Sequence, residues 1–181
     1  MPHFKALPDA ARFGDLRVAF PEPMDHLVPF AESLMSGPGP LTLGEREMIA
    51  AYVSGLNACR YCFGTHVQAA RAHGVDPDIL EAALADPASV PFGPGWAEVL
   101  TLVRKQTEAP SRIVQGDIDA ALEAGWSEDA VTRSCLIGAY YNMLNRIVDA
   151  FGIVADEGYY REAGERLAGV ARAAQARFSD P

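Results

Sequence analysis

The segment TLGEREMIAAYVSGLNACRYCFGTHVQAARAHG, residues 42–74, predicts two consecutive helices. Thr42 followed three residues later by Glu45 is a capping-box pattern, which opens a helix that runs to about Leu56. The charged residues of this helix stand only in its first turn, and none occurs in residues 48–59. Because a helix without a charged face is typical of protein interiors, we expect this helix to be buried on most sides.

The second helix follows directly. Asn57 is a suitable N-cap, the helical residues run from Ala58 to about His73, and Gly74 suits the C′ position that ends a helix. This boundary places Cys59 second and the next cysteine fifth in the helix. The two cysteines then lie one turn apart on one face.

Proline and glycine divide the rest of the chain into further helical segments, and alternating β-type patterns are nearly absent. We therefore predict an all-α, single-domain helical bundle over residues 23–181, with a redox core at 43–73. Residues 1–22, which contain three prolines, are expected to form an extended N-terminal arm. The other helices are expected at 22–37, 76–87, 93–110, 115–124, 128–150 and 155–177.

Composition narrows the class of protein. The chain has 181 residues, enough for one well-buried core, with 49% hydrophobic and 22% charged residues. A net charge of −9 argues against a nucleic-acid partner, which needs a basic surface. There is no apolar run of membrane-spanning length and no signal-peptide pattern, so we expect a cytoplasmic protein without a membrane partner. The 3 cysteines are too few for a secreted disulfide framework, and their odd number would leave one of them unpaired.

Cys59, Cys62 and His66 are the residues that carry chemistry. His66 is four positions after Cys62, so on a helix both side chains share a face, and the helix N-terminus stabilises a nearby thiolate. A histidine there can accept the thiol proton and leave an imidazolium beside the thiolate. One thiolate then attacks a peroxide oxygen, and the other cysteine condenses with the sulfenic acid to a disulfide that a dithiol must reduce.

Other uses of a Cys-x-x-Cys pair fit the sequence less well. A c-type haem needs histidine directly after the second cysteine, where Phe63 stands, and a thioredoxin-like site needs a βαβ context. A zinc site needs four ligands, usually in two separate pairs. Two buried cysteines without chemistry are a further alternative. We expect neither a metal nor an organic cofactor. The residues left to complete a zinc site are not paired at ligand spacing: Cys135, His73, His26 and His3.

Residues 43–70 resemble the core of the AhpD-like alkylhydroperoxidases, within the carboxymuconolactone decarboxylase superfamily. That core has a glutamate twelve residues before the first cysteine, then Cys-x-x-Cys, then histidine four residues later; here these are Glu47, Cys59, Cys62 and His66. The segment YYNMLNRIVDAFG (140–152) resembles the recurring Asn-Arg segment of the family's later helix. The length and the proline-rich N-terminus resemble the branch called peroxidase-related proteins.

The resemblance implies an all-α fold, homo-oligomers (trimers, or hexamers built from them) and thiol-dependent reduction of hydroperoxides. It implies that Cys62 is the peroxidatic thiol and Cys59 the resolving one, with His66 as proton acceptor linked to Glu47. Glu45 competes for the carboxylate role but is better explained by the capping box. Tyr61 stands where founding members have histidine, and since tyrosine is a poor base near neutral pH this removes one proton carrier.

Three polar residues stand out in the long apolar helix at 128–150. Asn142, Asn145 and Arg146 must find hydrogen-bond partners if they are buried, either in a substrate pocket or across a subunit interface. Cys135 in the same helix is read as a structural thiol.

The sequence thus predicts a peroxidase that uses a small hydroperoxide substrate and a dithiol reductant, with Cys62, Cys59, His66, Glu47 and Tyr61 at its site. Two alternatives are carried with it. One is an enzyme like the carboxymuconolactone decarboxylases, and the other is a non-enzymatic thiol redox sensor.

Overall fold

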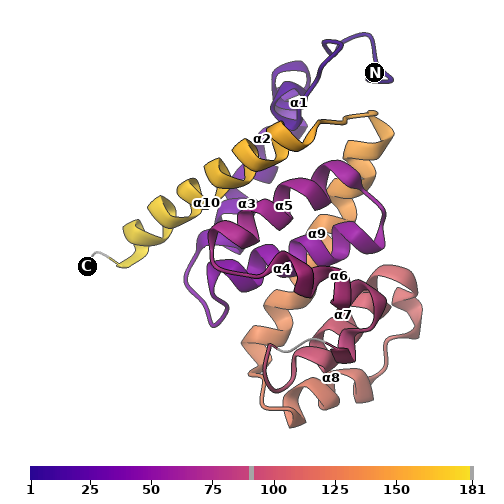
Figure 1. Cartoon of the computed structure of the whole chain (residues 1–181), viewed down its shortest axis with the longest axis vertical. Coiled ribbons are helices and arrows are strands. Elements are labelled where there is room, and N and C mark those ends of the chain that lie inside the picture. Colours follow the sequence, from indigo (N-terminus) through magenta and orange to yellow (C-terminus); the bar gives the residue numbers. More distant parts are fainter. Residues whose placement is uncertain (90–91, 180–181) are drawn as a thin grey trace.

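The computed structural model describes residues 1–89 and 92–179, in which every regular element is helical, so the predicted all-α fold is confirmed (Figure 1). The elements occur in the order α1 (Phe13–Ala19), α2 (Pro21–Asp25), α3 (Leu27–Ser36), α4 (Leu43–Leu56), α5 (Arg60–Ala72), α6 (Pro77–Ala85), η1 (Pro87–Ser89), α7 (Trp96–Glu108), η2 (Pro110–Arg112), α8 (Gln115–Glu123), α9 (Glu128–Ala150) and α10 (Glu157–Ser179).

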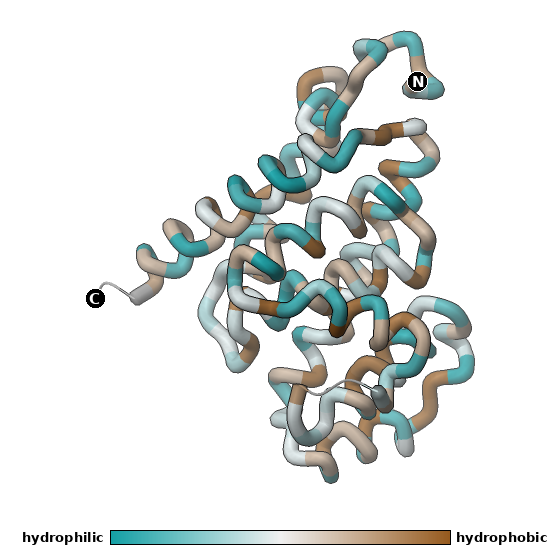
Figure 2. The backbone as a smooth tube through the Cα atoms, viewed as in Figure 1, coloured by the Kyte–Doolittle hydropathy of each residue, from teal (hydrophilic) through white to brown (hydrophobic). Residues whose placement is uncertain are grey.

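Helix α4 forms the centre of the bundle, as its uncharged sequence predicts. It packs against α5 on one side and α9 on another, and α10 lies along α5 (Figure 1). Residues 48–54 of α4 are all buried. Figure 2 shows that α10 is largely hydrophilic or neutral along its length, whereas strongly hydrophobic segments are concentrated elsewhere in the chain. No helix in the described ranges combines the length and the apolar character that crossing a membrane requires.

The capping box that opens α4 is present as predicted. The Glu45 carboxylate accepts hydrogen bonds from the backbone N–H and the hydroxyl of Thr42, at 2.7 Å and 2.9 Å. Next to it, the fully buried Arg46 donates to the backbone carbonyls of Leu41 (2.9 Å) and Gly37 (2.7 Å). These bonds satisfy the carbonyls of the α3–α4 connection and fix the helix start that carries the next residue, Glu47.

The prediction that residues 1–22 form an extended arm is corrected by the structure. Within residues 1–22 the chain forms α1 and begins α2, and the helix predicted at 22–37 is divided at His26 into α2 and α3. These short helices lack a strong local signal and are stabilised by burying Leu16 and Met24 against the bundle.

The N-terminal segment packs on its own chain. The backbone N–H of His3 donates to the carbonyl of Phe151 at 3.0 Å, and the Arg12 guanidinium donates to the carbonyl of Val154 at 2.9 Å. Its apolar residues join one buried cluster with Cys59 and Cys62, so residues 1–25 cover the end of the bundle that holds the cysteine pair.

Candidate active site

The start of α5 differs from the predicted boundary. Asn57 is the C-cap of α4 instead of the N-cap of α5, and Cys59 is itself the N-cap residue that precedes Arg60. Ala58 between them has a left-handed backbone, with φ of 55°. The turn is held by a hydrogen bond of 3.0 Å from the Cys59 N–H to the carbonyl of Ser54. The cysteines remain one turn apart, but Cys62 is the third residue of the helix.

The two thiols lie in different environments. Cys62 lines a cavity, whereas Cys59 is fully buried and does not line that cavity. Both are free thiols in this structure. The hydrogen bond between the two sulfurs keeps the proton on Cys59 and raises its pKa, with burial adding to the rise.

The pKa of Cys62 is lowered instead. The hydrogen bond from Cys59 contributes most to this, burial opposes it, and the positive charge of His66 and a hydrogen bond from Asn145 add to it. The exposed Asp149 acts weakly in the opposite direction. The geometry therefore favours a thiolate at Cys62 and a thiol at Cys59, the combination that a nucleophile and a resolving partner require.

His66 and Glu47 form a buried pair between α5 and α4. Nδ1 of His66 lies 2.6 Å from Oε2 of Glu47, and both side chains are at most 10% exposed. The fully buried Ala50 and Ala51 are small enough to let the two helices approach at this level. The expected link between His66 and Glu47 is thus present in the geometry, and Glu45 is occupied by its cap.

The protonation of His66 follows from this pairing. Burial disfavours its positive charge, but the attraction and hydrogen bond of Glu47, with the charge of Cys62, outweigh burial and raise the pKa of His66. Since Nδ1 is bonded to Glu47, Nε2 is the ring nitrogen left to exchange a proton with the cavity.

Asn145 connects the long helix α9 to the cysteine pair. It is 1% exposed, its Oδ1 accepts from Asn57 Nδ2 at 2.9 Å, and its Nδ2 donates to Ser54 Oγ at 3.0 Å. Its amide also contributes to the lowered pKa of Cys62. Asn142 supports the same network through Asn57, at 3.0 Å. Of the three polar residues singled out in this helix, only Arg146 is exposed, donating to the carbonyl of Asn142 at 2.6 Å.

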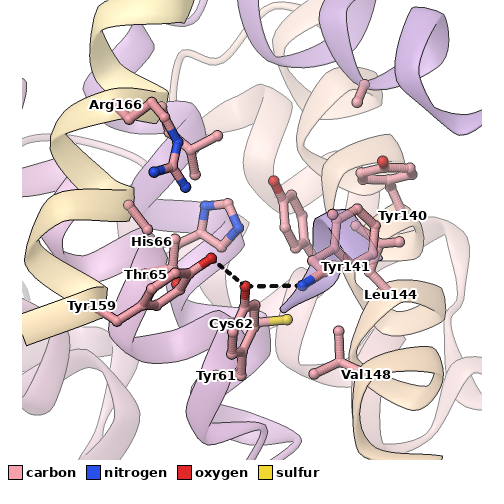
Figure 3. Close-up of a pocket in the computed structure, with 15 residues that line it drawn as sticks. Tyr61, Cys62, Thr65, His66, Tyr140, Tyr141, Leu144, Val148, Tyr159 and Arg166 are labelled. Carbon is pink, nitrogen blue, oxygen red and sulfur yellow. Dashed lines mark hydrogen bonds between the residues drawn. The ribbon is translucent and has the colours of Figure 1, made fainter. Parts of the chain in front are cut away.

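Tyr61 ties the N-terminal segment to the site. Its hydroxyl lies 2.7 Å from that of Tyr159, and Figure 3 draws this contact. The same hydroxyl accepts a hydrogen bond of 3.2 Å from the backbone N–H of Phe13. Burial raises the pKa of Tyr61, and the bond to Tyr159 contributes. Tyr61 therefore positions neighbouring elements and does not act as a base near neutral pH.

The cavity in front of Cys62 has a volume of about 240 Å³. Its wall is mostly aromatic and aliphatic, and His66 and Arg166 are its basic side chains (Figure 3). An adjoining cavity of about 280 Å³ shares His66 and adds Glu47. The lining residues that sequence reasoning left out come from α5, α9 and α10, where their apolar or amphipathic positions resembled ordinary core or surface: Thr65, Leu144, Tyr159 and Arg166.

The residues considered for a zinc site lie apart from the cysteine pair. Within residues 1–89 and 92–179 there is no group of three or more His, Cys, Asp or Glu side chains arranged to hold a metal ion. Cys135 is half-buried on α9, and His3 bonds the carbonyl of Ala150 at 3.1 Å.

Comparison with known proteins agrees with this geometry. The sequence model of the carboxymuconolactone decarboxylase family matches residues 21–105, which include the cysteine pair, His66 and Glu47. No curated protein matches the chain.

Two solved structures are similar to the chain. One is an uncharacterized peroxidase-related protein from Silicibacter sp. TM1040, with 25% identity and a TM-score of 0.73 over 81% of this chain and 76% of that one. The other is an uncharacterized peroxidase-related protein with an alkylhydroperoxidase AhpD core from Ralstonia eutropha JMP134. Its identity is 24% and its TM-score 0.73, over 84% of this chain and 80% of that one, so it supports the fold.

Proposed function

The chain belongs to the carboxymuconolactone decarboxylase superfamily, in its AhpD-like part, and from this premise we propose that it is a thiol-dependent peroxidase acting on hydroperoxides. The observation that carries the proposal is the position of Cys62. The Cys62 side chain faces a cavity, and the pKa of its thiol is lowered. The thiol of Cys59 lies behind it, and the pair formed by His66 and Glu47 lies beside it.

The first half-reaction uses Cys62 and His66. His66 takes the thiol proton, and the Cys62 thiolate attacks the terminal oxygen of the hydroperoxide, so that an S–O bond forms and the O–O bond breaks. The alkoxide that leaves takes the proton from the imidazolium and departs as an alcohol. The sulfur is oxidised to a sulfenic acid and the peroxide is reduced. Glu47 holds the imidazole in place and stabilises its charge.

The second half-reaction uses Cys59. Its sulfur attacks the sulfenic acid, a disulfide forms, and the hydroxyl group leaves with the Cys59 proton as water. A dithiol reductant then returns both cysteines to thiols by exchange and becomes a disulfide itself. No step needs a metal or an organic cofactor.

The test is the intact mass of the reduced protein before and after one equivalent of cumene hydroperoxide, with peptide mapping. A loss of two hydrogens at a Cys59–Cys62 bond is expected, followed by steady turnover with a dithiol. Cys59→Ser should stop at a sulfenic acid on Cys62, Cys62→Ser should be inert, and the control Cys135→Ser should behave as wild type. If peroxide does not oxidise the cysteines, the proposal is wrong. Oxidation without turnover would identify a redox sensor instead.

We also propose that the protein is a homo-oligomer. Apolar side chains of α3 and α10, two helices that are in contact, are exposed, and association of copies removes such surface from water. Light scattering during gel filtration tests this, and a monomer at micromolar concentration contradicts it. The exposed residues are Val28, Phe30, Val170 and Phe178.

A further inference from the structure

Arg166 is the one arginine of the cavity in front of Cys62. It lies on α10, its side chain is exposed, and Figure 3 shows the guanidinium on the same side of the cavity as the imidazole of His66. Among residues 1–89 and 92–179 no ion pair or hydrogen bond involves Arg166. In the adjoining cavity, by contrast, Arg177 is paired with Glu32.

The wall contains a second polar group without a partner. Thr65, which lies between Cys62 and His66 in the sequence, is 5% exposed and lines the same cavity. Its hydroxyl has no hydrogen-bond partner within the described residues. A buried hydroxyl without a partner costs free energy, so a ligand that bonds it is favoured. The cavity therefore offers one neutral donor near Cys62 and one cation at α10, with apolar and aromatic surface between them.

The negative net charge of the protein makes the Arg166 guanidinium more important for binding an anion. At −9 overall, the chain repels anions in general, so an anionic ligand needs a local positive group at the cavity. A guanidinium fits a carboxylate with two parallel hydrogen bonds and remains charged at every working pH. Because Arg166 is exposed, its charge is not already stabilised by a buried partner.

We propose that Arg166 recognises a carboxylate, and that the cavity takes small organic hydroperoxides that carry a carboxylate at the end remote from the O–O group. The inference rests on the proposed peroxidase function. A volume of about 240 Å³ lies below the roughly 300 Å³ at which sites for drug-sized ligands begin, so the body of the substrate is a single ring or a short chain. Thr65 bonds the hydroperoxide group and Arg166 sets its orientation toward Cys62.

The first experiment compares cumene hydroperoxide with its para-carboxylate at low ionic strength. Arg166→Leu is expected to lower kcat/KM for the carboxylate about tenfold, the loss of one charge-assisted bond, and to change the neutral compound less than twofold. Arg166→Lys should recover part of the preference. Arg161→Leu is the matched control, since Arg161 is exposed on the same helix and lines neither the cavity in front of Cys62 nor the adjoining one.

Thr65→Val separates the two polar groups. It should slow both hydroperoxides by a similar factor and leave the preference for the carboxylate unchanged. A lost preference in Thr65→Val, or equal effects of Arg166→Leu on both substrates, would overturn the role given to Arg166.

A second experiment does not depend on peroxidase activity. Calorimetry with the redox-inert 4-isopropylbenzoate and 4-isopropylbenzyl alcohol should show about tenfold tighter binding of the carboxylate, and Arg166→Leu should abolish the difference. If neither hydroperoxide is turned over, the peroxidase proposal fails while this comparison still decides the ligand class. Equal affinities of wild type for both compounds would refute carboxylate recognition.

Discussion

Cys59 and Cys62 are three positions apart, yet one has a raised pKa and the other a lowered one. The two pKa values differ because the two side chains point in different directions and have different neighbours. Cys62 faces the cavity, with His66 and Asn145 beside it, while Cys59 is enclosed by the N-terminal segment. Helical spacing alone places the two sulfurs together but does not say which one reaches solvent.

Removing the charge of His66 should raise the pKa of Cys62. After the hydrogen bond from Cys59 and the opposing effect of burial, His66 is the next contribution to the lowered pKa. In His66→Gln the thiolate loses this cation, so the midpoint of Cys62 alkylation should move up from a wild-type value below that of an ordinary cysteine. Iodoacetamide labelling rates between pH 5 and 10, resolved by peptide mapping, measure it.

His73→Gln is the control for this prediction, because His73 lies at the far end of α5 and does not line the cavity in front of Cys62. An unchanged midpoint in His66→Gln would show that His66 does not tune the thiolate.

Among the helices, the junction of α4 and α5 depends on an unusual backbone. Ala58 is exposed and has φ of 55°, a conformation that costs a residue with a side chain roughly 1–2 kcal/mol. Ala58→Gly should therefore increase the free energy of unfolding by about 1 kcal/mol without loss of contacts. Denaturant unfolding measures the change, and Ala58→Val, which is less tolerant of this conformation, should destabilise. A less stable Ala58→Gly protein contradicts the assignment of strain.

The contact of α10 with α5 depends on Gly164. A Cβ at this position would lie 2.5 Å from Cβ of Gln68 and 2.7 Å from the backbone nitrogen of Ala69. Because backbone atoms cannot move aside, Gly164→Ala should separate the helices and destabilise the protein by about 2 kcal/mol. It should also slow peroxide reduction, since α10 carries part of the cavity wall.

Gly169→Ala on the same helix is the matched control. An added Cβ there meets nothing within 4 Å, so the higher helix propensity of alanine should stabilise the protein by about 0.5–1 kcal/mol. Thermal unfolding of the two variants separates close packing from helix propensity, and similar effects in both would contradict the packing explanation.

Across the protein as a whole, the N-terminal segment covers the cysteine pair of its own chain. Tyr61 accepts from the backbone of Phe13 and contacts Tyr159 on α10, so it joins three parts of the chain that are distant in sequence. Where the superfamily resemblance implies a histidine, this chain has a tyrosine that holds the cover in place.

Tyr61→Phe should loosen this cover. Loss of the hydroxyl leaves the N–H of Phe13 without its partner, at a cost of about 1 kcal/mol, so local opening of residues 1–20 should become about fivefold more frequent. Hydrogen exchange of this segment and the alkylation rate of Cys62 measure the opening. Tyr52→Phe removes a hydroxyl that accepts from Arg104 elsewhere in the bundle and is the control. Unchanged exchange in Tyr61→Phe would show that the hydroxyl does not hold the segment.

Much of the fold and part of the site were predictable from local patterns. Caps and uncharged runs identified α4 and α9, and the spacing of Cys59, Cys62 and His66 placed them on one helix. The pairing of Glu47 with His66 was expected from the family resemblance and is present in the geometry, whereas the roles of these residues in catalysis stay predictions. The boundary at Asn57 was wrong because a left-handed Ala58 ends one helix before Cys59 caps the next.

The sequence by itself determined the helical architecture and the one-turn spacing of the two cysteines and His66, because capping, helical period and i, i+4 spacing act within a few residues. Only the tertiary structure decided which thiol faces the cavity, that α1 and α2 are helical, and that Asn145 on α9 bonds Ser54 on α4. It also decided that Arg166, unremarkable on an amphipathic helix, stands at the cavity wall. These contacts join residues far apart in the chain, so they depend on how whole helices pack and not on any local pattern.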